Sequence, residues 1–265
     1  MQGKQLAFPR NRRLILDICQ ASRSIPAFPV ERTLQIGEVS DARCQTETRI
    51  SWIAIFLRSY GLVCQKIPAL RQVFVTYPWN HLYEHPNTVA SVAIHREDPA
   101  GGKRLIWGRI PFPEFESLIQ IQSRLDHATH ATLNEVFRDG IRLERLPAPL
   151  RRFSWWLAMR WNGRRRAKKI GTFSVSTLAG ESALNRGHPI VATSSLSYSR
   201  CDADGACHVT LIADHRVLDG VLAAQALQLL EETLNGQVFI ELQALAKVSS
   251  HHERDHRVCD EERAA

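Results

Sequence analysis

The sequence predicts an α+β fold in which helices cover a mixed, largely antiparallel β-sheet. Three observations point to it: strand-like segments crowd into the second half of the chain, helices and strands do not alternate regularly as in βαβ proteins, and one pair of strands is separated by a short hairpin turn. The 265 residues, 44% hydrophobic and 23% charged, have the composition of a folded globular protein. They exclude a wholly disordered chain, collagen and a coiled coil.

The first half of the chain predicts two helices with a strand between them. Apolar residues at helical spacing from Leu14 predict a helix that ends near Ser24, because a proline follows the next residue and drives it toward extended geometry. The alternating segment 28–39 then predicts a strand. Helical spacing returns over 48–66, with Thr48 as the expected N-cap.

Five later segments have the alternating pattern and the flanking turn residues of strands: 88–95, 105–110, 171–178, 193–200 and 208–214. The last two are joined by Cys-Asp-Ala-Asp-Gly, a typical hairpin turn. Two further helices are predicted, over 114–125 and over 221–234, and Asn235 with Gly236 is expected to close the second. We interpret 8–245 as one domain and predict a disordered polar tail over 249–265.

No run of about 18 apolar residues occurs, and the start lacks the apolar stretch and small-residue cleavage site of a secretory signal. We therefore expect a cytoplasmic protein. Six cysteines are spread along the chain without a CxxC pair, which argues against a zinc ribbon or a disulfide scaffold. His81 and His85 have the spacing of helical metal ligands, but no third ligand accompanies them, so no metal site is expected.

The segment with the most chemical content runs from His208 to Gly220. It places His215 at the end of a predicted strand, Asp219 four residues later and a glycine before a helix. A histidine titrates near neutral pH and can remove a proton from an attacking group, so His215 is a candidate general base. The spacing alone is a weak signal, because most histidines in folded proteins have structural roles.

The surroundings of this segment are more specific. The residues ADHRVLDG resemble the active-site signature of the dihydrolipoamide acyltransferases of 2-oxoacid dehydrogenase complexes, and through them chloramphenicol acetyltransferase. Gly171-Thr-Phe-Ser-Val-Ser176 is similar to the family's Gly-Thr-Phe-Thr-Ile-Ser. The segments around Arg12, Pro26 and Pro68 resemble the family's first helix, the strand after it and the second helix, in the same order. The resemblance implies a catalytic domain over 8–245 with the chloramphenicol acetyltransferase-like two-layer sandwich.

The resemblance also implies an activity: moving an acyl group between a thioester of coenzyme A, a lipoyl group or a carrier protein and a thiol, hydroxyl or amine acceptor. His215 would be the general base. Ser176 would donate a hydrogen bond to the oxyanion, a contribution typically worth about 10² to 10³ in rate. Asp219 would orient the active-site loop by pairing with an arginine of the first helix, which we align as Arg12. No covalently bound cofactor is implied; coenzyme A, or a lipoyl or phosphopantetheine thioester, would be substrate.

The family's catalytic unit is a trimer with active sites between subunits, so His215 of one chain would meet Ser176 of the next. Complex-forming members carry a lipoyl domain ahead of this region, whereas the sequence has neither that domain nor a lipoyl-lysine motif. We therefore expect a stand-alone enzyme that obtains its acyl group or acceptor from free coenzyme A, a carrier protein or another polypeptide. Only 39 residues separate Ser176 from His215, fewer than in the complex-forming enzymes.

The formal net charge of +7 is concentrated in one place. The segment 149–170 holds eight bases and no acid, and it belongs to an expected insertion over about 126–170. On a helical wheel, one face of this segment is apolar and tryptophans lie among the arginines of the other. The residues that share the apolar face are Leu146, Leu150, Phe153, Leu157 and Trp161.

Three interpretations of this basic segment remain open. It could be a surface helix packed on its own domain or on a neighbouring subunit, with solvated arginines. It could be an anion platform, with Arg164, Arg165, Arg166 and Lys168 binding the phosphates of coenzyme A or an acidic carrier protein. It could lie on a membrane surface. Nucleic acid is not expected, because no binding module accompanies the segment. The alternative to an enzyme is a non-catalytic trimeric scaffold that docks partners or a membrane through these residues.

Overall fold

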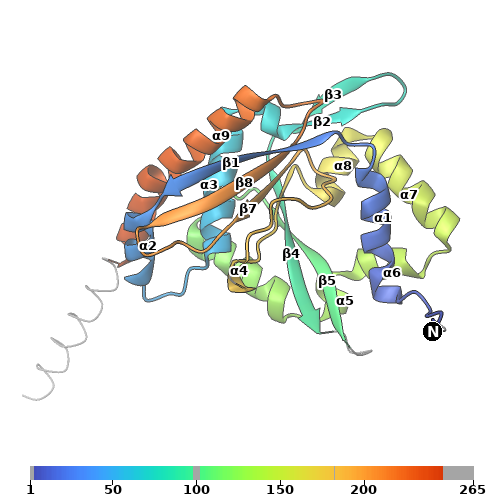
Figure 1. The fold of residues 1–265 in the computed structure, drawn as a ribbon, viewed down its shortest axis with the longest axis horizontal. Coiled ribbons are helices and arrows are strands. Elements are labelled where there is room, and N and C mark those ends of the chain that lie inside the picture. The colour runs from blue at the N-terminus through green and yellow to red at the C-terminus, as the bar shows by residue number, and fades with distance from the viewer. Residues whose placement is uncertain (1–2, 98–101, 182, 247–265) are drawn as a thin grey trace, which may run out of the picture.

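A six-stranded mixed sheet forms the centre of the fold in the computed structural model, which describes residues 3–97, 102–181 and 183–246 (Figure 1). In spatial order the strands are β1 (Ala27–Gln35), β8 (Ala206–Asp214), β7 (Ser194–Tyr198), β6 (Phe173–Val175), β4 (Val89–Glu97) and β5 (Lys103–Pro111). The short strand β6 is parallel to both of its neighbours, and the other pairings are antiparallel. The predicted mixed, largely antiparallel sheet is confirmed.

Helices cover both faces of this sheet. One face packs on α2 (Gly37–Cys44), α3 (Trp52–Lys66), α4 (Leu118–His130) and α9 (Gly220–Thr233). The other faces α1 (Arg13–Ser22), α5 (Leu133–Val136), α6 (Arg138–Arg145), α7 (Ala148–Arg160) and α8 (Gly163–Ile170), which lie on the right of Figure 1. Apart from α1, the helices of this second group all come from the predicted insertion.

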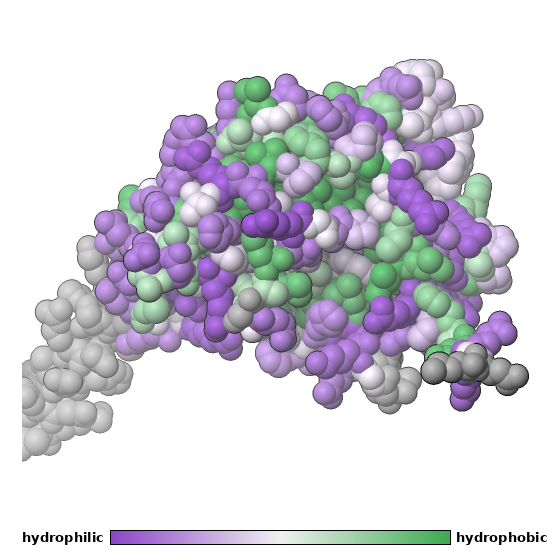
Figure 2. Space-filling model, in the orientation of Figure 1, coloured by the Kyte–Doolittle hydropathy of each residue, from purple (hydrophilic) through white to green (hydrophobic). Residues whose placement is uncertain are grey.

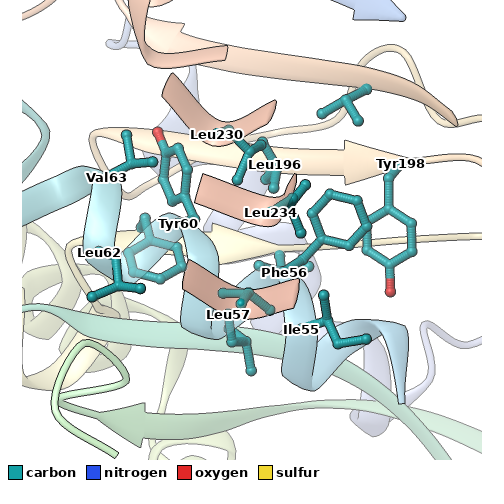
Figure 3. Close-up of a cluster of buried hydrophobic side chains, with 14 of the residues drawn as sticks. Ile55, Phe56, Leu57, Tyr60, Leu62, Val63, Leu196, Tyr198, Leu230 and Leu234 are labelled. Atoms are coloured by element: carbon teal, nitrogen blue, oxygen red, sulfur yellow. The ribbon is translucent and has the colours of Figure 1, made fainter. Parts of the chain in front are cut away.

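The main core surrounds α3, whose residues 54–57 and 60–64 are almost all buried. A helix that is apolar on nearly every side must lie inside the protein. Figure 3 shows how it is fixed: Phe56 stacks on Tyr198 of β7 with ring centroids 4.1 Å apart, while Tyr60 lies near Leu230 of α9. The N-cap is Ser51, whose side chain accepts a hydrogen bond from the backbone N–H of Ala54, rather than the predicted Thr48.

The structure differs from the predicted elements in further places. The strand predicted over 28–39 ends at Gln35, and a helix that was not predicted, α2, begins at Gly37. Asn235 and Gly236 do not close the last helix, because a π-helical turn over Leu234–Val238 carries the helical backbone on to residue 246. A two-stranded sheet of β2 (Gln72–Val75) and β3 (His81–Glu84) was not predicted. The tail predicted over 249–265 lies outside the described residues. None of the described helices is long and apolar enough to cross a membrane.

The helix α7 buries a different side from the apolar face that the helical wheel predicts. Its buried side carries Arg151, whose guanidinium forms an ion pair with the buried carboxylate of Asp17 on α1. Most large side chains of the predicted apolar face are exposed instead, with Leu150 56%, Phe153 60% and Trp161 49% exposed, whereas Leu157 is half-buried. Two buried opposite charges must be paired, and this pair fixes the orientation of the helix.

Candidate active site

His215 follows the last residue of β8, in a loop that ends at the start of α9. Its backbone N–H donates to the carbonyl oxygen of Pro26, and its ring packs against Phe28 with centroids 4.6 Å apart. Pro26 immediately precedes β1 and Phe28 lies at its start, and β1 is the neighbour of β8 in the sheet. The histidine is therefore held from outside its own loop, while its side chain remains exposed.

The hydrogen bond of the ring determines which nitrogen is free. Nδ1 of His215 lies 3.1 Å from the carbonyl oxygen of Leu218. A carbonyl oxygen only accepts, so Nδ1 carries the hydrogen and the neutral ring keeps its lone pair on Nε2. No other described residue takes a hydrogen bond from this ring. The arrangement presents Nε2 as an available base.

An ion pair that the sequence analysis missed holds the loop behind this histidine. The guanidinium of Arg216 binds both carboxylate oxygens of Asp214, with Nε to Oδ1 at 2.8 Å and Nη2 to Oδ2 at 2.6 Å. Its remaining nitrogen donates to the carbonyl oxygen of Ser24, and its plane lies over the ring of Phe74. Asp214 is fully buried. An acid and a base directly flanking the histidine were the available signal in the sequence.

Asp219 has a different partner from the one predicted. Its carboxylate caps α9 by accepting a hydrogen bond from the backbone N–H of Leu222 at 2.8 Å. Arg12 ends a 3₁₀ turn before α1, next to β5, whereas the other end of α1 approaches the His215 loop through Ser24. The ten residues of α1 separate these ends by about 15 Å. The predicted pair of Arg12 with Asp219 is therefore not formed within the chain.

Ser176 follows β6 and lines a cavity of about 650 Å³ between the sheet and the helices α1, α6, α7 and α8. Its backbone N–H donates to the carbonyl oxygen of Leu196, which continues the pairing with β7. Its hydroxyl forms no hydrogen bond with a described residue and is half-buried. Figure 2 shows hydrophobic surface gathered in the hollowed middle of this face.

The register of the sheet keeps Ser176 and His215 apart. Phe173, Ser194 and Ala213 lie side by side on β6, β7 and β8. Ser176 lies three residues beyond this row and His215 lies two residues beyond it in the opposite direction. Five residues of strand correspond to about 16 Å, and β7 lies between them. Neither His215 nor Asp219 lines the cavity. One chain cannot bring the two predicted catalytic side chains together.

The four predicted anion-binding residues lie on α8 and divide into two groups. Arg164, Arg165 and Lys168 are exposed, and Arg165 lines the same cavity as Ser176. Arg166 is only 1% exposed, and its guanidinium donates to the carbonyl oxygens of Phe74 and Val191. Burial lowers the pKa of Arg166 to about 10. The prediction that Arg166 binds an anion together with Arg164, Arg165 and Lys168 does not fit the structure, because Arg166 is buried and its Nη1 and Nη2 groups donate to backbone carbonyl oxygens.

A second histidine near Ser176 was not predicted. Nε2 of His188 lies 2.7 Å from the hydroxyl of Ser195, which in turn lies 2.7 Å from the hydroxyl of Ser174. Burial lowers the pKa of His188, so its ring is neutral at pH 7. His188 and Ser174 both line the cavity. Alternate serines in Ser174-Val-Ser176 were the only sequence signal for this polar wall. No group of three or more possible metal ligands occurs among the described residues.

Comparisons with known proteins identify the fold. No protein-family model and no curated protein matches the chain. A probable dihydrolipoamide acetyltransferase from Listeria monocytogenes is 18% identical, with a TM-score of 0.64 over 88% of this chain and 94% of that one. The cubic core of the pyruvate dehydrogenase multienzyme complex is 14% identical, with a TM-score of 0.66 over 90% of this chain and 94% of that one.

A third similar structure is the dihydrolipoamide acetyltransferase of Azotobacter vinelandii, studied for the role of one serine, one histidine and one asparagine in its catalytic mechanism. It is 14% identical, with a TM-score of 0.64 over 90% of this chain and 94% of that one. This chain has the fold of a dihydrolipoamide acetyltransferase catalytic core. The resemblance seen in the sequence is confirmed as a resemblance of fold.

Proposed function

We propose that this protein is an acyltransferase that moves an acyl group between a thioester and a thiol, hydroxyl or amine acceptor, with His215 as general base. The observation that carries the proposal is the hydrogen bond from Nδ1 of His215 to the carbonyl oxygen of Leu218, which leaves Nε2 free on an exposed, firmly held loop. The shared fold with dihydrolipoamide acetyltransferase cores supports it.

In the proposed reaction, Nε2 of His215 takes the proton of the acceptor while the acceptor atom attacks the carbonyl carbon of the thioester. The carbonyl electron pair moves to oxygen, and the hydroxyl of Ser176 donates a hydrogen bond to the resulting oxyanion. The carbonyl then re-forms and the carbon–sulfur bond breaks. The thiolate leaves with the proton that His215 held, so the histidine returns to its starting state.

We further propose that the active site forms between chains of a homotrimer. The separation of about 16 Å along the strands between His215 and Ser176 of one chain supports a site to which two chains contribute. Among the similar structures, the cubic core of a multienzyme complex is an assembly of many chains, which supports this arrangement. Oligomerisation would then be part of the catalytic mechanism.

The test is to incubate the protein with a panel of acyl-coenzyme A thioesters and dihydrolipoamide and to measure free coenzyme A. Release is expected to require both the acceptor and His215, and His215→Ala should lower it about 10² to 10⁴-fold. His208→Ala is the matched control, because His208 is an exposed histidine of β8, the strand that precedes His215, and its ring hydrogen-bonds to Thr33. Undiminished release by His215→Ala would refute the mechanism.

The exposed side of α7 favours a second candidate, a scaffold that docks a partner or a membrane. Phe153 stacks on Trp156, and Trp161 stacks on Tyr77 with centroids 4.2 Å apart. Large exposed apolar clusters of this kind mark interaction surfaces. Co-sedimentation with anionic vesicles that is lost in Phe153→Ser/Trp161→Ser would support membrane docking. Absence of co-sedimentation by the wild type would remove the membrane from consideration.

A further inference from the structure

The cavity beside Ser176 lies between the sheet and four helices that cover it. Its floor is the sheet face of β4, β5 and β6, and its roof is built by α1, α6, α7 and α8. Three of these four helices come from the segment 138–170. Protein interiors are close-packed and rarely contain voids much larger than a water molecule, whereas ligand sites occupy about 300 to 1,000 Å³. A cavity of about 650 Å³ therefore has the size of a ligand site.

Most of the wall is apolar. Ile15 and Ile18 of α1 and Trp155 and Leu157 of α7 form part of the roof, and Trp107 of β5 forms part of the floor. A hydrocarbon chain gains free energy by leaving water for such a surface, roughly in proportion to the apolar area that it buries. The walls therefore favour an extended apolar group over a polar metabolite.

The floor also offers neutral polar groups. Ser91 of β4 and Ser174 of β6 line the cavity, and Ser195 of β7 lies beside Ser174 behind the wall. The side-chain amide nitrogen of Asn185 lies 3.3 Å from Nδ1 of His188, and the amide oxygen accepts from Gly187, so Nε2–H of His188 donates to Ser195. The hydroxyl of Ser176 has no such partner among the described residues. It is free to donate to a carbonyl oxygen of a bound molecule.

One side of the wall is strongly cationic. Arg109 of β5, Arg142 of α6, and Arg165 and Lys169 of α8 all line the cavity, against the single carboxylate of Asp139. Lys169 Nζ binds Asp139 Oδ2 at 2.6 Å. The pKa of Asp139 is lowered, first by Lys169 and also by Arg109 and Arg142, which indicates that these cations act on one place. Arg109, Arg142 and Arg165 form no ion pair with a described residue, so the described wall of the cavity carries a net positive charge.

We infer that this cavity binds one anionic amphiphile: an apolar chain of fatty-acyl size along α1 and α7, with a carboxylate or phosphate held by Arg109, Arg142 and Arg165. The inference has two parts. That the cavity binds an anionic amphiphile does not depend on catalysis. That the amphiphile is the acyl donor, with a long apolar acyl chain and its carbonyl at Ser176, rests on the proposed function. A free fatty carboxylate and an acyl-coenzyme A thioester share the required chemistry.

The test measures binding of parinaric acid, a fluorescent fatty carboxylate, by energy transfer from the cavity tryptophans Trp107 and Trp155, followed by displacement with other ligands. Dodecanoate or dodecanoyl-coenzyme A is expected to displace the probe, and the stronger of the two identifies the source of the anion. Dodecanol, which has the same chain without a charge, should displace it at least about tenfold more weakly. Equal displacement by dodecanol would overturn the role of the cations.

Two neighbouring arginines provide the matched variants. Arg165 lines the cavity and Arg164 does not, although both are exposed on α8. Arg165→Gln/Arg142→Gln should weaken dodecanoate binding about tenfold or more and leave dodecanol binding unchanged, whereas Arg164→Gln should change neither. Equal loss in Arg164→Gln would overturn the inference. Ala158→Trp, which fills the cavity from α7, should abolish binding of both ligands.

Failure of this inference is distinguishable from failure of the proposed function. His215→Ala should retain full parinaric acid binding, because His215 does not line the cavity. If the protein transfers acyl groups with His215 but binds no amphiphile, the proposed function stands and the cavity assignment falls. If amphiphiles bind through Arg165 and no thioester is turned over, the cavity assignment stands alone.

Discussion

Replacing Arg216 by methionine should lower the free energy of unfolding by about 3 kcal/mol, since it leaves the fully buried carboxylate of Asp214 without its bidentate partner. Breaking a buried ion pair costs about 3 to 5 kcal/mol. The lower end applies because the nearby guanidinium of Arg166 also attracts Asp214 and the backbone N–H of Arg216 still donates to it. Urea unfolding followed by tryptophan fluorescence measures the change.

Lys169→Met provides a control with the same contact distance. Lys169 and Asp139 also lie 2.6 Å apart, but their side chains are 58% and 53% exposed, so losing this pair should cost only about 0.2 to 1 kcal/mol. Adding Asp214→Asn to Arg216→Met should recover part of the loss, because no buried charge remains. If Arg216→Met and Lys169→Met are equally destabilised, burial does not determine the strength of the pair and the reasoning is refuted.

Three further outcomes are expected. Gly171→Ala should lower the free energy of unfolding by about 1 to 3 kcal/mol in urea, because φ of Gly171 is +107° and an added Cβ would lie 2.9 Å from a backbone oxygen of β4. Gly180→Ala, whose Cβ would meet open space, should not lower it. The lowered pKa of His188 means that its neutral ring stabilises the folded protein above pH 6.5, and that this stability is lost as the pH falls through the lowered pKa. The difference in unfolding free energy between wild type and His188→Gln should therefore change between about pH 7.5 and about pH 5.5. A constant difference over this range would contradict the prediction. Co-refolding inactive Ser176→Ala and His215→Ala chains in equal amounts should restore about one quarter of the wild-type activity. Random pairing joins an intact histidine to an intact serine at about one quarter of the interfaces. No recovery would argue against a shared site.

The sequence predicted most successfully where short-range patterns carry the information. The hairpin between β7 and β8 follows from its turn residues, and Gly205 takes the positive φ that such a turn requires. The position of His215 at the end of a strand also follows from local pattern. The helix cap at Asp219 is local as well, but a resemblance to the family's arginine pair drew the prediction toward Arg12 instead.

The errors arose where a side chain is satisfied by residues far away in the chain. A run of arginines is normally solvated, and nothing in its spacing shows that Arg166 reaches the carbonyl oxygens of Phe74 and Val191. The helical wheel of α7 failed for the same reason, because Arg151 finds Asp17 inside the protein. A lone acid within the apolar run of α1 was the available warning. The cavity could not be predicted, because it exists only once α1, α6, α7 and α8 pack over the sheet.

The two proposals together assign different tasks to neighbouring chains. Ser176 and Arg165 line one cavity within a chain, whereas His215 lies at the other end of the sheet. In a shared site, the chain that binds the acyl group would also stabilise its oxyanion, and its neighbour would supply only the base. In assemblies mixed from Ser176→Ala and His215→Ala chains, only the His215→Ala chain has an intact Ser176. Arg165→Gln on that chain should impair acyl transfer, whereas Arg165→Gln on the Ser176→Ala chain, which contributes only His215, should have no effect. Activity that depends equally on both placements would show that acyl binding and the base reside on the same chain.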